Sequence, residues 1–323
     1  MAEFDLIAAI RARSRHARDD VRLGIGDDAA LLQPAPGMQL VACTDTLNAG
    51  VHFPAATVPQ AIGWKALAVN LSDLAAMGAE PAWALLALSL PQADAAFVEA
   101  LADGLARLAA QHGVALVGGD TTRGPLGLTV TALGQVAAGA ALLRSGARVG
   151  DVVLVTGTLG DAAAGLEIAQ RVSQGGVDAH AAWLRQRLDY PAPRVAAGLA
   201  LRGLATACID LSDGLLADLG HLCAASGVGA EVELDALPLS PALRASVPVA
   251  QAQAWALGGG DDYELCFCVA PAQVDSALAR VQAAGGVARA IGRIVATPGV
   301  RVRVRDAQGR DYAPVRRGYE HFA

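Results

Sequence analysis

Aromatic residues are scarce in this sequence. They make up 4% of the 323 residues, which leaves few side chains on which nucleic-acid bases could stack. A basic surplus is also missing, because the formal net charge is -6 at pH 7. Non-specific binding to nucleic acid depends on clustered Lys and Arg, so the two absences together argue against a nucleic-acid partner.

No long hydrophobic run is present. The longest, WALLALSL, lies between Pro81 and Pro91 and is too short to span a bilayer, so we expect a buried strand there and no membrane association. The opening residues MAEFDLIAAIRARS carry two acidic side chains and have no apolar core before a small-residue cleavage site. They therefore predict no signal peptide.

Cysteines are few, odd in number and without metal-type spacing. This pattern predicts reduced and mostly buried thiols in a cytoplasmic protein. The five residues are Cys43, Cys208, Cys223, Cys266 and Cys268.

The rest of the composition is that of a globular protein. Hydrophobic residues make up 54% and charged residues 17%, and a chain of this length exceeds what one hydrophobic core usually holds. Helical and strand patterns alternate in two blocks, separated by the turn-rich stretch LLRSGARVGD. We therefore predict an α+β protein of two domains, residues 1–138 and 139–323.

The hydrophobic periodicity predicts the elements of each block. In the first block we expect helices over 4–13, 58–77 and 92–112, and strands over 40–47, 82–90, 113–118 and 126–137. In the second we expect strands over 152–157 and 205–210 and helices over 160–172, 194–203 and 214–227, followed from 264 by strand, helix, strand and strand.

Aspartates recur beside glycines or at the ends of apolar strands. They are Asp27, Asp28, Asp45, Asp73, Asp120, Asp210, Asp213, Asp261 and Asp262. Any one of them could be a helix N-cap or a turn residue, but the number of similar segments favours a shared role. Converging carboxylates repel one another unless a cation neutralises them. An oxygen-only ligand set points to magnesium rather than zinc.

Protein-bound magnesium usually holds phosphate, yet the familiar phosphate loops are absent. The single lysine, Lys65, follows Gly63 and Trp64, so no G-x-x-x-x-G-K-[ST] loop is present. The segment TGTLGDAAAG misses the G-x-G-x-x-G spacing, and no protein-kinase catalytic-loop signature occurs. A nucleotide would be held by glycine backbones, magnesium and arginine, with Arg123 and Arg144 as candidates unless they are solvated surface residues.

Eight segments occur together in an order that resembles the thiamine-monophosphate kinase family, within the superfamily of aminoimidazole ribonucleotide synthetase. They are GIGDDAALL, CTDTLNAGVHF, KALAVNLSDLAAMGA, VGGDTTRGP, RSGARVGD, TGTLGDAAAGL, IDLSDGL and GGGDDYEL. The resemblance runs from the first helix to GYEHF, almost the whole chain. It implies two α/β domains of the synthetase type, dimerisation through the amino-terminal one, a nucleotide between domains, and ATP-dependent phosphorylation of thiamine monophosphate to thiamine diphosphate.

The resemblance also implies roles for individual residues. It gives magnesium ligands at Asp28, Thr44, Asp45, Asp73, Asp120, Asp210 and Asp213, of which Asp45, Asp120 and Asp210 are the catalytic set. It gives nucleotide contacts at Gly119, Asp120, Arg144 and Ser212, and thiamine contacts at His52, Asp261 and Tyr319. Asp28 is then expected in the interior, because magnesium supplies its counter-charge.

Three positions depart from the family pattern. Cys43 stands where Ser is frequent, so a hydroxyl ligand is lost although the main-chain carbonyl could serve. Asp261 stands where Glu is common, which shortens the reach to substrate. ALADGLARLAA lacks the family's aromatic residue near position 103, which leaves the adenine contact unassigned.

Other activities within the superfamily fit less well. A selenophosphate synthetase would have a reactive Cys and a Lys near the amino terminus, whereas the first Cys here is Cys43 and no Lys precedes Lys65. A hydrogenase-maturation synthetase would end in a cysteine tail, but this chain ends GYEHFA. A non-catalytic nucleotide sensor is the alternative from another class, and the intact aspartate set argues against it.

Overall fold

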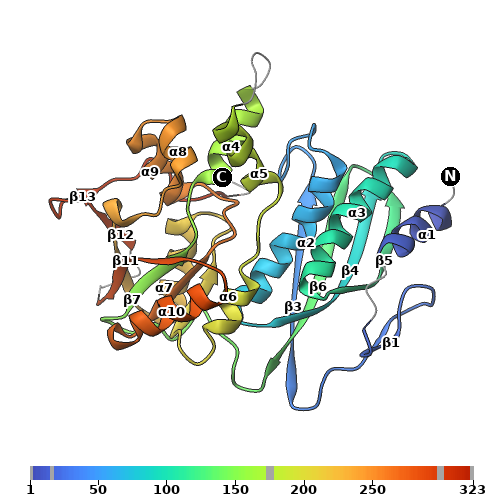
Figure 1. Ribbon diagram of the computed structural model, residues 1–323, viewed down its shortest axis with the longest axis horizontal. Coiled ribbons are helices and arrows are strands. Elements are labelled where there is room, and N and C mark those ends of the chain that lie inside the picture. Colours follow the sequence, from blue (N-terminus) through green and yellow to red (C-terminus); the bar gives the residue numbers. More distant parts are fainter. Residues whose placement is uncertain (1–2, 15–17, 172–177, 297–301, 321–323) are drawn as a thin grey trace. The chain divides into compact units, whose positions relative to one another are not determined.

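The computed structural model describes residues 3–14, 18–171, 178–296 and 302–320. The chain forms two compact units. The amino-terminal unit comprises Met1–Leu74 and Ala79–Gly139, and the carboxy-terminal unit comprises Ala75–Gly78 and Ala140–Ala323. Both mix helices and strands (Figure 1), as the sequence predicts.

The amino-terminal unit is built on a four-stranded sheet in the order β3-β6-β4-β5. Its strands are β3 (Met38–Asn48), β4 (Glu80–Leu90), β5 (Ala115–Arg123) and β6 (Gly127–Ala137). Helices α2 (Pro59–Ala76) and α3 (Ala95–His112) lie against one face (Figure 1). Side chains alternate accordingly: Leu128, Val130 and Ala132 of β6 are buried, whereas Thr129 and Thr131 between them are half-buried.

Two glycines let α2 and α3 touch at the backbone. A Cβ placed on Gly63 would lie 2.0 Å from the Leu101 carbonyl oxygen, and one on Gly104 would lie 1.9 Å from the Gln60 carbonyl oxygen. A larger residue at either position would force the helices apart, so this pair fixes how closely α2 and α3 pack.

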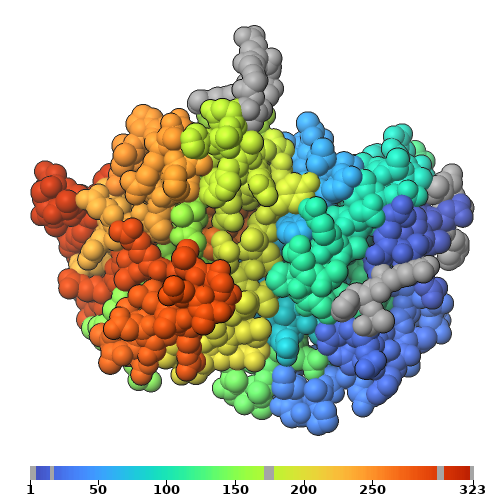
Figure 2. Space-filling view, in the orientation of Figure 1, coloured from blue at the N-terminus to red at the C-terminus, as the bar shows by residue number. Residues whose placement is uncertain are grey.

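The amino terminus covers the β5 edge of this sheet and part of its other face. Helix α1 (Glu3–Arg13) packs beside α3 (Figure 2), with Arg13 paired to Glu99 and Asp103 at 2.8 and 2.9 Å. Residues 18–33, which include the short strands β1 (Val21–Leu23) and β2 (Leu31–Leu32), then cross the sheet near buried Trp83. We call residues 18–33 the crossing segment.

A polar cluster fixes the start of the crossing segment. The Trp83 indole donates to the Asp20 carboxylate at 3.0 Å, and Arg18 pairs with the same carboxylate at 2.7 Å. Arg18 also donates to the Gly113 carbonyl oxygen at 2.8 Å, beside the start of β5. The crossing segment is thereby tied to two strands of the sheet.

The carboxy-terminal unit contains a seven-stranded sheet in the order β13-β12-β9-β11-β7-β10-β8. The strands are β7 (Val152–Thr156), β8 (Ala207–Asp210), β9 (Gly229–Glu233), β10 (Leu265–Val269), β11 (Ala288–Val295), β12 (Val302–Arg305) and β13 (Asp311–Tyr312). The helices are α4 (Asp161–Arg171), α5 (Ala179–Asp189), α6 (Val195–Ala200), α7 (Leu215–Ser226), α8 (Pro241–Ser246), α9 (Val249–Gly258) and α10 (Val274–Ala283). One aliphatic core joins the central strands to α7 and α9.

Two strands are longer than the sequence predicts. β3 begins two residues before and ends one residue after the predicted 40–47, and β5 continues through Asp120 to Arg123. Cross-strand hydroxyl pairs prolong the β3–β6 ladder, with Thr44 and Thr131 at 3.0 Å and Thr46 and Thr129 at 2.8 Å. Asp45 and Asp120 therefore lie within strands, and the expectation that they mark strand ends was wrong.

All five cysteines are free, and all except half-buried Cys43 are buried. Over the ranges that the structure describes, no helix has the length and apolar character needed to cross a membrane.

Candidate functional site

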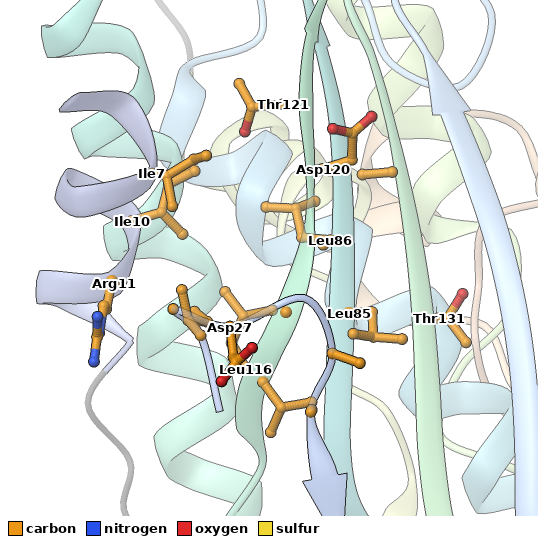
Figure 3. Close-up of a pocket in the computed structure, with 18 of the residues that line it drawn as sticks. Ile7, Ile10, Arg11, Asp27, Leu85, Leu86, Leu116, Asp120, Thr121 and Thr131 are labelled. Atoms are coloured by element: carbon orange, nitrogen blue, oxygen red, sulfur yellow. The ribbon is translucent and has the colours of Figure 1, made fainter. Parts of the chain in front are cut away.

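A pocket of about 1040 Å³ opens in the amino-terminal unit between α1, the crossing segment and the sheet (Figure 3). Ile7 and Ile10 of α1 face the strands across it, and Leu85 and Leu116 form part of the opposite wall. The pocket therefore has an apolar side as well as the polar groups described next.

Acidic side chains and glycine backbones converge on this pocket. Asp27 and Asp28 come from the crossing segment, and Asp120 follows Gly119 on β5. Arg11 of α1 supplies a positive charge in the same lining (Figure 3). Asp28 is exposed in the pocket wall, so the expectation that it lies in the interior was wrong. The Asp28 amide donates to the Asp27 carboxylate at 2.8 Å in an exposed turn, where water solvates both groups.

Gly119 brings β5 against β4 at the pocket floor. Its φ is +147°, and a Cβ there would lie 1.8 Å from the Leu86 carbonyl oxygen. No other residue type fits this contact. The glycine thus has a packing role, and it also leaves its own backbone open toward a ligand.

Asp120 and Asp45 lie on opposite faces of the sheet. Asp120 is in register with Ala87 of β4, and Ala87 is in register with Thr129, so these three share the face that bears the pocket. Asp45 pairs with buried Val130 and lies on the face covered by helices. The register thus separates two carboxylates that the sequence grouped together.

A second acidic group surrounds Cys43 on the helix-covered face. The Cys43 sulfur lies 3.4 Å from the Asn70 carbonyl oxygen of α2. Burial, followed by the charges of Asp73 and Asp45, raises the pKa of the Cys43 thiol. Burial also raises the pKa of Asp45. Asp45 and Asp73 are therefore neighbours, and the thiol between them stays protonated and is a poor ligand for magnesium.

Two other predicted residues of this unit have defined hydrogen bonds. The Thr44 hydroxyl donates to the Val130 carbonyl oxygen at 3.2 Å and lies on the face opposite Asp45. The His52 Nδ1 atom accepts the Asn48 amide at 2.9 Å, and buried Lys65 donates to the His52 carbonyl oxygen at 3.0 Å. Lys65 thus fixes the loop that presents His52.

A third acidic group lies in the carboxy-terminal unit, where β8 ends. Asp210 is the last residue of β8, and Asp213 follows it in the turn before α7. Asp218 accepts the amides of Asp213 and Gly214 at 3.1 and 3.0 Å. Burial, together with the charges of Asp210 and Asp213, raises the pKa of Asp218 to about 8. Sequence reasoning missed Asp218, which reads as an ordinary residue of the first helical turn.

The predicted substrate residues Asp261 and Tyr319 both meet this turn through the backbone. The Asp261 amide donates to the Ser212 carbonyl oxygen at 2.9 Å, and the Tyr319 amide donates to the Asp213 carbonyl oxygen at 3.0 Å. Three segments far apart in sequence are therefore held side by side within one unit. Arg144 is exposed, and its carbonyl oxygen accepts the Ser226 hydroxyl at 3.1 Å.

Within the part of the chain that the structure describes, no three His, Cys, Asp or Glu side chains form a group able to hold a metal ion. The chemistry of the donors nevertheless fits magnesium, because the three acidic groups offer hard oxygen atoms. Burial is the main cause of the raised pKa of Asp218, and the charges of Asp210 and Asp213 at the β8 turn add to it. A divalent cation would relieve the repulsion among these carboxylates.

Two family models match the chain in succession and define the class of protein. The AIR synthase related protein N-terminal domain matches residues 26–136, and the AIR synthase related protein C-terminal domain matches residues 148–305. Thiamine-monophosphate kinase from Salmonella typhimurium is 48% identical, over 99% of this chain and 98% of that protein. The crystal structure of thiamine-monophosphate kinase from Stenotrophomonas maltophilia K279a is 55% identical with a TM-score of 0.86, covering 94% of this chain and 96% of that one.

The structure of AaThiL complexed with AMPPCP and TMP is also similar. It is 32% identical with a TM-score of 0.78, and the match covers 99% of this chain and 97% of that chain. The chain therefore belongs to the thiamine-monophosphate kinase family, in agreement with the resemblance seen in its sequence.

Proposed function

We propose that this protein transfers the γ-phosphoryl group of ATP to thiamine monophosphate, giving thiamine diphosphate and ADP. The observation that carries the proposal is the full-length likeness to thiamine-monophosphate kinases at 48% identity. The similar structure of AaThiL, of which the match covers 97%, is a complex with AMPPCP, an ATP analogue, and TMP.

The pocket of the amino-terminal unit suits the phosphates of a nucleotide. Its glycine backbones allow close approach, and its apolar wall suits an uncharged ring. Three aspartates and one arginine line it, so its net charge repels phosphate unless a divalent cation is present. Arg11, Ile7 and Ile10 join Gly119 and Asp120 as proposed nucleotide contacts. Arg144 and Ser212 remain proposed nucleotide contacts from the sequence resemblance.

Magnesium is part of the proposal. Its proposed ligands are Asp28 and Asp120 at the pocket, Thr44 on the same sheet face, Asp45 and Asp73 on the helix-covered face, and Asp210 and Asp213 at the β8 turn. Because Asp45 and Asp120 lie on opposite faces of one sheet, they would hold different ions. Bound magnesium supplies neutralisation and alignment of phosphate oxygens. Because the Thr44 hydroxyl and Asp45 lie on opposite faces, they would not hold the same ion.

The chemistry asks little of the side chains as acids or bases. An oxygen of the thiamine monophosphate phosphate attacks the γ-phosphorus, the bond from that phosphorus to the β–γ bridging oxygen breaks, and ADP leaves. The attacking phosphate is already ionised near neutral pH, so no strong general base is needed. The residues His52, Asp261 and Tyr319 would bind and orient the thiamine substrate.

Assembly and location complete the proposal. On the sheet face that also bears the pocket, the β3 and β6 residues Leu40, Thr46 and Thr129 are uncharged, which suits covering of the β3 side by a second copy in a homodimer. Free thiols at all five cysteines suit the reducing cytoplasm.

The test is an assay of ADP formation with ATP and magnesium, with and without thiamine monophosphate. We expect ADP to form in proportion to the thiamine diphosphate produced, and calorimetry to show weak ATP binding in chelator compared with magnesium. No dependence of ADP formation on thiamine monophosphate would overturn the assignment. Equal ATP affinity in magnesium and in chelator would instead remove the metal site.

A further inference from the structure

The loop that carries Asp261 has an unusual backbone. Residues 259–264 connect α9 to β10, and within them Asp261 and Tyr263 have φ values of 69° and 49°. Non-glycine residues rarely adopt this left-handed conformation. We call residues 259–263 the Asp261 loop. Its surroundings must therefore hold it in place.

The three residues after Asp261 are tied to two other segments of the unit. The Asp262 carboxylate accepts the Gly160 amide, at the start of α4, at 2.8 Å. The Tyr263 amide donates to the Leu211 carbonyl oxygen at 2.8 Å. The Leu211 amide donates in turn to the Glu264 carbonyl oxygen at 2.8 Å. The loop is thus fastened directly beside the turn that bears Asp213.

Glu264 is the most heavily engaged of these anchors. Its side chain is fully buried, and it pairs with Arg187 of α5 at 2.8 Å and with Arg194 through the Arg194 Nε atom at 2.6 Å and a second guanidinium nitrogen. The Thr156 hydroxyl donates to it at 2.6 Å from the end of β7. Gly157 permits this approach, since a Cβ there would lie 2.2 Å from a Glu264 carboxylate oxygen.

A contribution to stability does not by itself explain why Glu264 is buried with two arginines. A buried ion network contributes little net stability compared with apolar residues of the same volume, because the charges lose their hydration. It does fix geometry, because a guanidinium fork accepts few orientations of its carboxylate. The network consists of Glu264, Arg187, Arg194 and Thr156. Glu264 follows the Asp261 loop directly in the chain.

We infer that Glu264, held by Arg187 and Arg194, is a positioning residue that sets the Asp261 loop for binding thiamine monophosphate. The inference rests on the proposed function, since Asp261 acts there on the thiamine substrate. The Glu264 side chain is fully buried, so it would act on substrate only through the residues around it. It acts through the backbone of Tyr263 and through Leu211, which join the loop to the β8 turn.

The test compares Glu264→Gln with Asp151→Asn as a matched control. Asp151 is buried in the same unit, where it accepts the Arg148 amide at 2.9 Å and the Thr206 hydroxyl at 2.7 Å at the opposite end of β7. We expect Glu264→Gln to raise the KM for thiamine monophosphate about tenfold. Its KM for ATP should stay within about twofold of wild type. Asp151→Asn should lower Tm without separating the two KM values.

Arg187→Lys keeps the charge and removes the fork, so it tests the inference even if Glu264→Gln does not fold. We expect a smaller rise in the same KM. Hydrogen exchange of a peptide covering residues 258–264, measured without substrate, should be faster in both variants and unchanged in Asp151→Asn. Equal changes in the two KM values, or unchanged exchange in this peptide, would overturn the positioning role. If wild-type ADP formation did not depend on thiamine monophosphate, the proposed function would be overturned instead. The hydrogen-exchange result would still decide whether Glu264 orders the Asp261 loop.

Discussion

Asp73 lies in the last turn of α2, where a negative charge is unfavourable. The helix dipole places partial negative charge at this end, and Asp45 adds its own charge across the Cys43 thiol. The structure excludes an N-cap role, because α2 begins at Pro59. The proposed metal site accounts for the presence of a carboxylate at this unfavourable position.

Asp73→Asn tests whether Asp73 is a magnesium ligand or only a residue that destabilises the helix end. We expect activity to fall by roughly two orders of magnitude, or about 3 kcal/mol of transition-state stabilisation, because a magnesium ligand loses its charge. The Tm of the metal-free protein should be unchanged or higher, because repulsion falls. Magnesium titrations of turnover, together with melting curves in chelator, provide the measurement.

Asp94→Asn is the matched control. Asp94 is the N-cap of α3 and accepts the Phe97 amide at 3.1 Å, and Asn caps a helix about as well as Asp. It should leave both activity and Tm near wild type. An Asp73→Asn protein with the magnesium titration curve of wild type would remove Asp73 from the site.

Asp218 makes stability depend on pH. Its pKa is about 8 in the folded protein, whereas the usual value is 3.8. Between these values the native state keeps a proton that the unfolded chain has released, so the free energy of unfolding falls as pH rises, by at most about 1.4 kcal/mol per pH unit. The contribution is complete below about pH 4 and is lost as pH rises through about 8.

In chelator, the Tm of wild type should therefore fall between pH 5 and 8 relative to that of Asp218→Asn. Asn cannot ionise and keeps an oxygen for the Gly214 amide. Calorimetric melting of both proteins across this range provides the measurement. Parallel curves would show that Asp218 is ionised throughout.

At the scale of elements, α2 and α3 depend on the glycine pair Gly63 and Gly104. Gly104→Ala should destabilise the protein by about 1–3 kcal/mol, because its Cβ would meet the Gln60 backbone at 1.9 Å. Gly220→Ala is the opposite case, since Gly220 lies inside α7 with nothing within 4 Å of an added Cβ. Gly220→Ala should raise the free energy of unfolding by about 0.5–1 kcal/mol. Urea unfolding measures the free energy of unfolding of both variants. If both substitutions change this free energy in the same direction, the packing argument is contradicted.

Elements with strong periodicity and clear ends could be predicted from sequence, and others could not. α3 has the Asp94 cap and ends at Gly113, and the predicted 92–112 agrees with it closely. α9 was missed because VAQAQAWALG has no marked apolar stripe. α8 was also missed, although Ser240 followed by Pro241 is a recognisable helix start. In the structure Ser240 accepts the Leu243 amide at 3.0 Å.

The candidate site shows the same limit. Gly119 and Asp120 were predicted from their segment, and they line the pocket. Ile7, Ile10 and Arg11 were not, because nothing local in an amphipathic helix states which sheet face it will cover. The opposite faces of Asp45 and Asp120 follow from strand register, which a single sequence leaves open once the strand ends are misplaced.

At the scale of the whole molecule, the exposed part of the amino-terminal sheet bears on assembly. Leu40 is 52% exposed on β3, and Thr46 pairs with Thr129 beside it at 2.8 Å. The β3 side of this face carries no charged side chain, whereas Asp120 of β5 lines the pocket on the same face, so a second copy that covers β3 would bury little charge. We expect wild type to sediment as a dimer of 32.7 kDa chains.

Thr46→Arg tests which face is covered. The guanidinium would be buried against its own copy without a counter-charge, a cost of several kcal/mol at each of two symmetric positions. We therefore expect a folded monomer at micromolar concentration, measured by sedimentation equilibrium, with the circular dichroism of wild type. Val287→Arg is the control, because Val287 is 67% exposed in the other unit and should leave the dimer intact. A dimeric Thr46→Arg protein would place the interface elsewhere, and a monomeric wild type would remove the dimer from the proposal.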